Sequence, residues 1–136
     1  IPIGLADIKR EGNDVTVVSF GKIIKEAYKA AELLSSEGID CEIIDLRTVR
    51  PLDHKTIINS VKKTNRLVIL EEAWPFGNVS TEITFQVQSQ AFDYLDAPIE
   101  KINTADTPAP YSPVLLQEWL PNSNDVVNAV KKVLYK

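Results

Sequence analysis

The sequence predicts an α/β fold, in which a mostly parallel sheet lies between two layers of helices. Two features predict it. Apolar runs of strand length, three of them nearly continuous in Val, Ile and Leu, indicate strands that are covered on both faces. Segments with helical three-to-four apolar spacing separate these runs, so that right-handed crossovers make the strands parallel. We expect residues 1–136 to form a single domain, because a chain of 136 residues can bury one core.

Five segments are candidates for the strands of this sheet. A short edge strand is expected at Ala6–Arg10. Four longer runs have the composition of buried strands, and they cover Val15–Phe20, Cys41–Leu46, Arg66–Glu72 and Pro98–Thr104.

Helical patterns lie between the strands. The first helix presents an apolar face and ends at Gly38; the face consists of Ile23, Ile24, Ala27, Ala30, Ala31 and Leu34. The second begins after the N-cap Asp53, where Leu52 and Ile57 stand at hydrophobic-staple positions. The sequence therefore predicts one helix in each of the first two crossovers.

Two further helices complete the predicted fold. Apolar residues spaced by four precede the last strand, at Val79, Ile83, Val87 and Ala91. A final helix begins at about Ser123 and carries lysines at its C-terminal end, where they complement the helix dipole. Between the last strand and this helix, four prolines predict a long irregular segment: Pro108, Pro110, Pro113 and Pro121. A packed contact surface would explain so long a loop in a compact domain.

Composition excludes several classes of function. A net charge of −4 and a pI of about 5.0 argue against a nucleic-acid partner, and no apolar run approaches the roughly 18 residues of a membrane span. With Cys41 as the only cysteine and His54 as the only histidine, neither a disulfide nor a four-ligand zinc site is expected. The apolar surroundings of Cys41 indicate a core thiol. Because the chain lacks methionine and begins at Ile1, we expect it to be a fragment of a longer protein.

No residue set in the sequence forms a recognisable catalytic, cofactor-binding or metal-binding motif. Ser19 lacks the surroundings of a nucleophile elbow, and His54 at a helix start is expected to be solvated. The five glycines have neither the dinucleotide-binding nor the P-loop spacing. Glu71 and Glu72 are adjacent on a strand, so they face opposite sides and form no dyad.

One of these two glutamates is expected to be buried and paired, for example with Arg47 or Arg50.

The aromatic residues indicate a different kind of site. Trp74 and Phe76 lie in a loop after a buried strand, and two more rings, Tyr111 and Trp119, lie in the proline-rich segment. Large rings on irregular backbone are enriched at the centres of protein interfaces, so these residues favour a contact surface over a catalytic cleft.

Six segments, in order and with matching gaps, carry a specific resemblance to a known family. They read Ile1-Pro2-Ile3-Gly4, Val15-Thr16-Val17-Val18-Ser19, Asp45-Leu46-Arg47-Thr48-Val49-Arg50-Pro51-Leu52-Asp53, Val61-Lys62-Lys63-Thr64-Asn65-Arg66, Glu71-Glu72-Ala73-Trp74-Pro75-Phe76-Gly77 and Ala105-Asp106-Thr107-Pro108-Ala109-Pro110-Tyr111. Together they resemble the C-terminal domain of the β subunit of pyruvate dehydrogenase. Two departures concern loop detail: Asn78 opens a segment that is commonly Gly-rich in the family, and Thr104 stands where Gly is usual.

The resemblance implies a transketolase C-terminal domain-like fold, with a five-stranded mixed sheet that has one antiparallel edge strand. It implies an α2β2 enzyme that decarboxylates pyruvate on thiamine diphosphate and transfers the acetyl group to a lipoyl group. In that family the cofactor and its magnesium are held by the α subunit and by the N-terminal domain of β. The resemblance therefore implies that this fragment binds no cofactor, is inactive alone, and serves as an assembly and docking domain.

The implied partners are the α subunit, a second β subunit and the peripheral subunit-binding domain of the dihydrolipoyl acyltransferase. The resemblance assigns the last of these contacts to Asp96 and to the terminal carboxylate of Lys136, and the aromatic residues Trp74, Phe76 and Tyr111 complete the expected partner-binding set. The bacterial cytoplasm or the mitochondrial matrix is the implied location.

Two alternatives remain open at the level of sequence. The first keeps the family and changes the substrate to branched-chain 2-oxo acids or acetoin. The second is a free-standing flavodoxin-like module that binds a small anion near Gly21 and Glu72.

Overall fold

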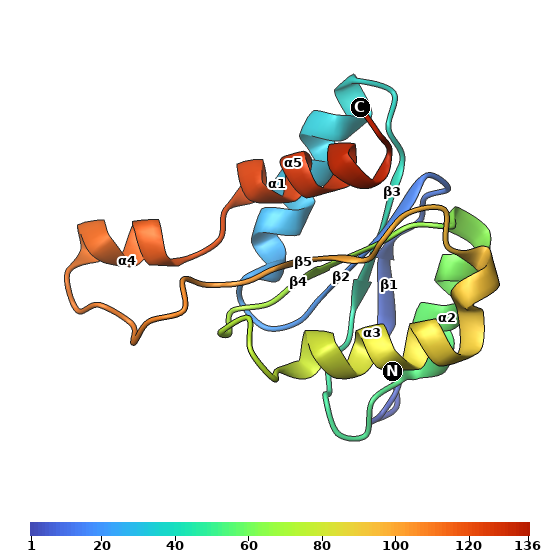
Figure 1. The fold of residues 1–136 in the computed structure, drawn as a ribbon, viewed down its shortest axis with the longest axis horizontal. Coiled ribbons are helices and arrows are strands. Elements are labelled where there is room, and N and C mark those ends of the chain that lie inside the picture. Colours follow the sequence, from blue (N-terminus) through green and yellow to red (C-terminus); the bar gives the residue numbers. More distant parts are fainter.

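In the computed structural model, which describes residues 1–136, five strands form one sheet in the order β1-β3-β2-β4-β5 (Figure 1). The strands are β1 (Asp7–Arg10), β2 (Val15–Ser19), β3 (Cys41–Asp45), β4 (Leu67–Leu70) and β5 (Glu100–Ile102). Strands β2 to β5 are parallel, and β1 pairs with β3 in the antiparallel direction at the edge. The predicted fold class is confirmed, including the antiparallel edge strand.

Helices cover both faces of the sheet. Helix α1 (Ile24–Ser36) and helix α5 (Ser123–Val133) pack together on one face, and α2 (His54–Thr64) and α3 (Val79–Ala91) pack together on the other. The alternation of strand side chains divides the core accordingly, with Val17 facing α1 and α5 and Val18 facing α2 and α3. No helix combines the length with the apolar character that a bilayer crossing requires.

Each strand is shorter than the apolar run that predicts it. The run Arg66–Glu72 contains a ladder of four residues, and the run Pro98–Thr104 contains a ladder of three. The ends leave the ladder for physical reasons. Pro98 has no N–H to donate, and beyond Leu70 only the Glu71 N–H still reaches β5, where it donates to the Ile102 carbonyl at 3.0 Å.

The predicted helix ends are confirmed where a local cap defines them. Helix α1 is followed by Gly38 in the left-handed conformation (φ 79°), which a residue with a side chain adopts only with strain. Helix α5 begins with a capping box, in which the Asn122 side chain accepts from the Asp125 backbone N–H and the Asp125 carboxylate accepts from Asn122.

Asp53 caps α2 and also fastens the edge of the sheet. One carboxylate oxygen accepts from the Thr56 N–H at 3.2 Å, and the other accepts from the Ala6 N–H at 2.9 Å and from the Thr56 hydroxyl at 2.6 Å. Burial by itself raises the pKa of Asp53, but the hydrogen bonds from Thr56 and Ala6 outweigh it and hold the pKa below the usual value.

Replacing Asp53 by alanine should lower the free energy of unfolding by about 1–2 kcal/mol, because both the cap and the tie to Ala6 are lost. The pKa of Asp53 is lower in the folded state than in the unfolded state. The charged carboxylate therefore stabilises the fold at pH values above the unfolded-state pKa, and this stabilisation is lost as the pH falls through the folded-state pKa. Urea unfolding across acidic pH measures this. Asp53→Asn keeps a capping oxygen and should lose the part of the pH dependence of stability that Asp53 contributes. If the free energy of unfolding of this variant depended on pH as that of the wild type does, the assignment would be contradicted.

The proline-rich segment contains a helix that the sequence does not predict. Helix α4 spans Pro113–Trp119 within the segment that was expected to be irregular, so that expectation is wrong for these residues. Pro113 occupies the first turn of the helix, where a backbone N–H is not needed and the fixed φ of proline suits helical geometry. Residues 106–119, here called the α4 arm, stand away from the body of the domain on the left of Figure 1.

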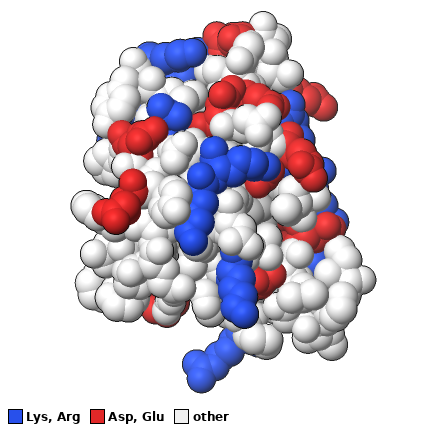
Figure 2. Space-filling model, turned by 90° about the vertical axis from the view of Figure 1, so that its right-hand side faces the viewer, with Lys and Arg blue, Asp and Glu red and all other residues white.

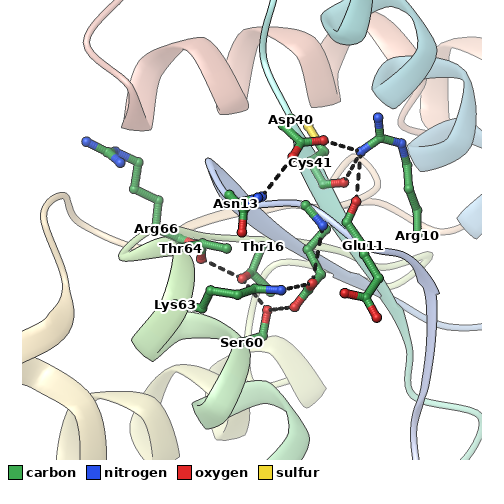
Figure 3. A network of polar contacts seen from close by, with 12 residues as sticks. Arg10, Glu11, Asn13, Thr16, Asp40, Cys41, Ser60, Lys63, Thr64 and Arg66 are labelled. Atoms are coloured by element: carbon green, nitrogen blue, oxygen red, sulfur yellow. Dashed lines mark hydrogen bonds and ion pairs between the residues drawn. The ribbon is translucent and has the colours of Figure 1, made fainter.

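A buried polar network ties β2 and β3 to α2 (Figure 3). The Glu42 side chain is 1% exposed and accepts hydrogen bonds from Ser60 Oγ at 2.5 Å and from Lys63 Nζ. Thr16 Oγ1 bonds in turn to Ser60 Oγ at 2.6 Å and to Thr64 Oγ1 at 2.7 Å. Because these groups lie at the N-terminal ends of the parallel strands, the network lies away from the edge where such sheets bind ligands.

Candidate contact surface

The carboxyl ends of the parallel strands carry one fully buried carboxylate. Glu71 follows β4 and accepts hydrogen bonds from Ser80 N at 2.9 Å, Ser80 Oγ at 2.8 Å and Asn103 Nδ2 at 2.8 Å. The negative side chain therefore satisfies the N-terminus of α3 and binds it to the segment after β5. Glu72 is exposed on the other side, so the two glutamates form no dyad, as predicted.

The expected pairing of a buried glutamate with Arg47 or Arg50 is wrong. The backbone N–H and hydroxyl of Ser80 and the amide of Asn103 satisfy Glu71 instead, because the start of α3 lies directly over the strand end. The Arg47 guanidinium bonds elsewhere, donating to the carbonyls of Ile1, Pro2 and Leu5.

The other candidates for chemistry are separate from one another. Ser19 is the buried last residue of β2, and its hydroxyl has no hydrogen-bond partner. His54 is half-buried at the start of α2, in a shallow hollow shared with Arg50 and Glu82. The cavity beside Glu72 and the hollow at His54 are separate, and Ser19 lines neither of them.

The Cys41 thiol lies in the core, as predicted. It is buried beside β1, and burial raises its pKa to about 12. Since the thiolate is the reactive form, this cysteine is chemically inert at neutral pH.

The side chains of this chain do not fit the magnesium ion that the resemblance implies for the full enzyme. No group of three or more His, Cys, Asp or Glu side chains is arranged to hold a metal ion. The acidic groups at the strand ends are either satisfied within the protein, as Glu71 is, or isolated on the surface, as Glu72 is.

The structure brings together two of the predicted aromatic residues. The indole N–H of Trp74 and that of Trp119 both donate to the carbonyl oxygen of Thr107, at 2.7 and 2.9 Å. The arm closes at its base, where the Ala105 N–H donates to the Trp119 carbonyl at 3.1 Å. Trp74 and Trp119 therefore join the loop after β4 to the α4 arm, a contact between positions 45 residues apart that sequence patterns do not reveal.

Two other predicted aromatic residues stand clear of the domain. Phe76 is 88% exposed and Tyr111 is 102% exposed, so neither ring covers the core of its own domain. The Phe76 loop is nevertheless braced, because Asn78 Nδ2 donates to the carbonyls of Trp74 and Phe76 and Lys101 Nζ donates to that of Pro75. A large ring held by rigid backbone in solvent is suited to contact with another polypeptide.

Asp96 lies beside the C-terminal end of the chain. Its side chain is 56% exposed and stands 3.8 Å from Arg66 Nη2, and its carbonyl accepts from the Tyr135 hydroxyl at 3.3 Å. Tyr135 thus contacts Asp96, and Lys136 is the next residue along the chain. The nearby Arg66 was missed by sequence reasoning because it is 30 positions away.

Figure 2 shows the side of the molecule where α2 lies, on which basic side chains form a central band with acidic ones on both sides.

Comparison with known proteins decides the family. The sequence profile of the transketolase C-terminal domain matches residues 4–126. The chain belongs to this family. Among solved structures, a chain described as a split-gene transketolase, inactive β4 tetramer, superposes on this transketolase C-terminal domain with a TM-score of 0.88 and 27% identity, covering 99% of this chain and 44% of the other.

Three curated relatives bear the name of one enzyme. The pyruvate dehydrogenase E1 component subunit beta of Rickettsia felis is 54% identical over 99% of this chain and 41% of its own length. That of Rhizobium meliloti is 56% identical over 100% of this chain and 30% of its own length, and the mitochondrial one of Dictyostelium discoideum is 49% identical over 98% and 37%. The transketolase C-terminal domain described here thus spans less than half the length of each relative.

Proposed function

We propose that this chain is the C-terminal domain of the β subunit of a thiamine-diphosphate-dependent pyruvate dehydrogenase, and that its role is subunit assembly and docking. Identity of about half of all residues with subunits of that name, along the whole chain, carries the proposal. The exposed rings of Phe76 and Tyr111 support the assembly role, since their burial requires a partner.

The chemistry of the full enzyme takes place, in this proposal, on polypeptide outside residues 1–136. The α subunit and the N-terminal domain of β hold thiamine diphosphate and magnesium, and pyruvate is decarboxylated there before the acetyl group passes to a lipoyl group. This domain contributes contacts with the α subunit and with a second β subunit. The bacterial and mitochondrial relatives make the bacterial cytoplasm or the mitochondrial matrix the proposed location.

The choice of pyruvate over branched-chain 2-oxo acids or acetoin rests on the names of the relatives. An assay of the full-length subunit, assembled with its α partner and thiamine diphosphate, tests this choice. Pyruvate should give the highest kcat/KM. A higher value for a branched-chain 2-oxo acid or for acetoin would transfer the proposal to the corresponding dehydrogenase.

Asp96 is the proposed docking residue for the peripheral subunit-binding domain of the acyltransferase. More than half of its side chain is open to solvent, and its ion pair with Arg66 is long, at 3.8 Å, so the carboxylate can exchange this contact for one with a basic group of the partner. Such charge pairs act mainly on specificity and on the rate of encounter.

Replacing Asp96 by lysine should weaken acyltransferase docking by about an order of magnitude or more, because like charges then meet across the contact. Calorimetric titration of the assembled enzyme at low salt measures the change. Asp93→Lys, three residues away in the single 3₁₀ turn η1 (Phe92–Tyr94), makes the same change of charge as a control. Equal affinities for the wild type and Asp96→Lys would remove Asp96 from the docking site.

A further inference from the structure

The charges of the chain are separated along the sequence. Between Leu67 and Val130, Lys101 is the only basic residue, while nine acidic residues fall in the same stretch. This stretch contains α3, β5 and the α4 arm, together with the Trp74 loop. A partner of the loop and the arm therefore meets a segment in which acidic residues far outnumber basic ones, with Lys101 as its single basic side chain.

A cavity of about 310 Å³ opens between the Trp74 loop and the α4 arm, here called the tryptophan cavity. Its walls are formed by Glu72, Ala73, Trp74, Asn78, Ala109 and Trp119. The shared bond to the Thr107 carbonyl holds both indole rings in place before anything binds. Ala73 and Ala109 have short side chains, so the space between the rings stays open.

Glu72 is the only charged residue that lines this cavity, and it has no hydrogen-bond or ion-pair partner in the structure. Two partly buried carboxylates elsewhere in the chain are paired, Asp40 with Arg10 and Glu100 with Lys132, whereas Glu72 is available to a group from outside. A free carboxylate beside two ordered indole rings attracts a cation that also has flat apolar surface.

We propose that the tryptophan cavity receives an arginine side chain from a partner polypeptide. The planar guanidinium stacks on the indole faces while its N–H groups donate to the Glu72 carboxylate. The proposal deepens the assembly function and rests on it, because it names the kind of side chain that one contact surface accepts.

The test is a titration of the 136-residue chain with the peptide acetyl-Ala-Ala-Arg-Ala-Ala-amide, observed through the indole N–H resonances of Trp74 and Trp119. Both resonances should shift and saturate. The same peptide with citrulline, which has the shape of arginine without its charge, should bind at least about fivefold more weakly. Glu72→Gln should weaken arginine binding by about fivefold, and Glu82→Gln, on the outer face of α3, should leave it unchanged.

Three results would overturn the inference: indole resonances that do not shift, equal binding of arginine and citrulline, or equal effects of Glu72→Gln and Glu82→Gln. Equal binding of citrulline would assign the cavity to an apolar side chain, and equal effects of the two glutamine variants would show only a general attraction by the acidic surface. A separate measurement of the assembly of the full-length enzyme distinguishes failure of the arginine inference from failure of the proposed assembly function. A normal complex whose isolated domain ignores the arginine peptide would contradict the inference alone.

Discussion

Aspartate in place of Phe76 should prevent the full-length subunit from assembling with its partners. The ring is almost fully exposed on a braced loop, so its apolar surface is available to be buried in a contact. A charge at the centre of such a contact has no partner and loses its water, which costs about 2–4 kcal/mol, or roughly thirty- to a thousandfold in affinity. Sedimentation of the coexpressed subunits over a range of concentrations measures this shift.

The fold itself should survive, because Phe76 makes no contribution to either apolar core. The free energy of unfolding of the isolated chain, measured by thermal denaturation, should therefore change by less than about 0.5 kcal/mol. Tyr111→Asp tests the α4 arm in the same way, and Leu33→Asp places the same charge at an exposed apolar position of α1 outside the proposed surfaces. Normal assembly of both the Phe76 and the Tyr111 variants would contradict the contact role of these rings.

Replacing Lys63 by methionine should destabilise the domain more than replacing its partner Glu42 by glutamine. The ammonium of Lys63 reaches solvent, whereas the Glu42 carboxylate is almost fully buried and depends on Lys63, Ser60 and the Gly12 N–H. Without Lys63 a buried charge is left with neutral donors only. We expect a loss of roughly 2–3 kcal/mol, below that of a fully buried pair because one partner is open to water.

Urea unfolding of the single and double variants isolates this effect. Glu42→Gln removes the charge while keeping the bond to Ser60, so it should cost about 1 kcal/mol and should partly rescue Lys63→Met when the two are combined. Lys62→Met removes a neighbouring charge on the exposed face of α2 and should cost less than about 1 kcal/mol. A larger loss for Glu42→Gln than for Lys63→Met would show that the buried charge is not what Lys63 compensates.

Local signals explain which parts of the fold were predictable. The valine and isoleucine runs of β2 and β4, the cap Asp53 and the stop at Gly38 each express a preference of neighbouring residues, and the structure has all of them. Helix α4 was missed because prolines in a loop and a proline in the first helical turn have the same sequence signature. Only the surrounding backbone decides between the two.

For the proposed contact surface, the sequence indicates residue types but not geometry. Aromatic residues on irregular backbone indicated an interface, and the exposures of Phe76 and Tyr111 agree with that interpretation. No pattern reveals that Trp74 and Trp119 converge on one carbonyl, or that donors from α3 and Asn103 satisfy Glu71. Such contacts depend on how distant segments fold together.

The proposal that catalysis takes place on polypeptide outside residues 1–136 can be tested directly. The purified chain of residues 1–136, supplied with pyruvate, thiamine diphosphate, magnesium and an artificial electron acceptor, should reduce the acceptor no faster than the cofactor does alone. Turnover of pyruvate that rises in proportion to the amount of this chain would contradict the account.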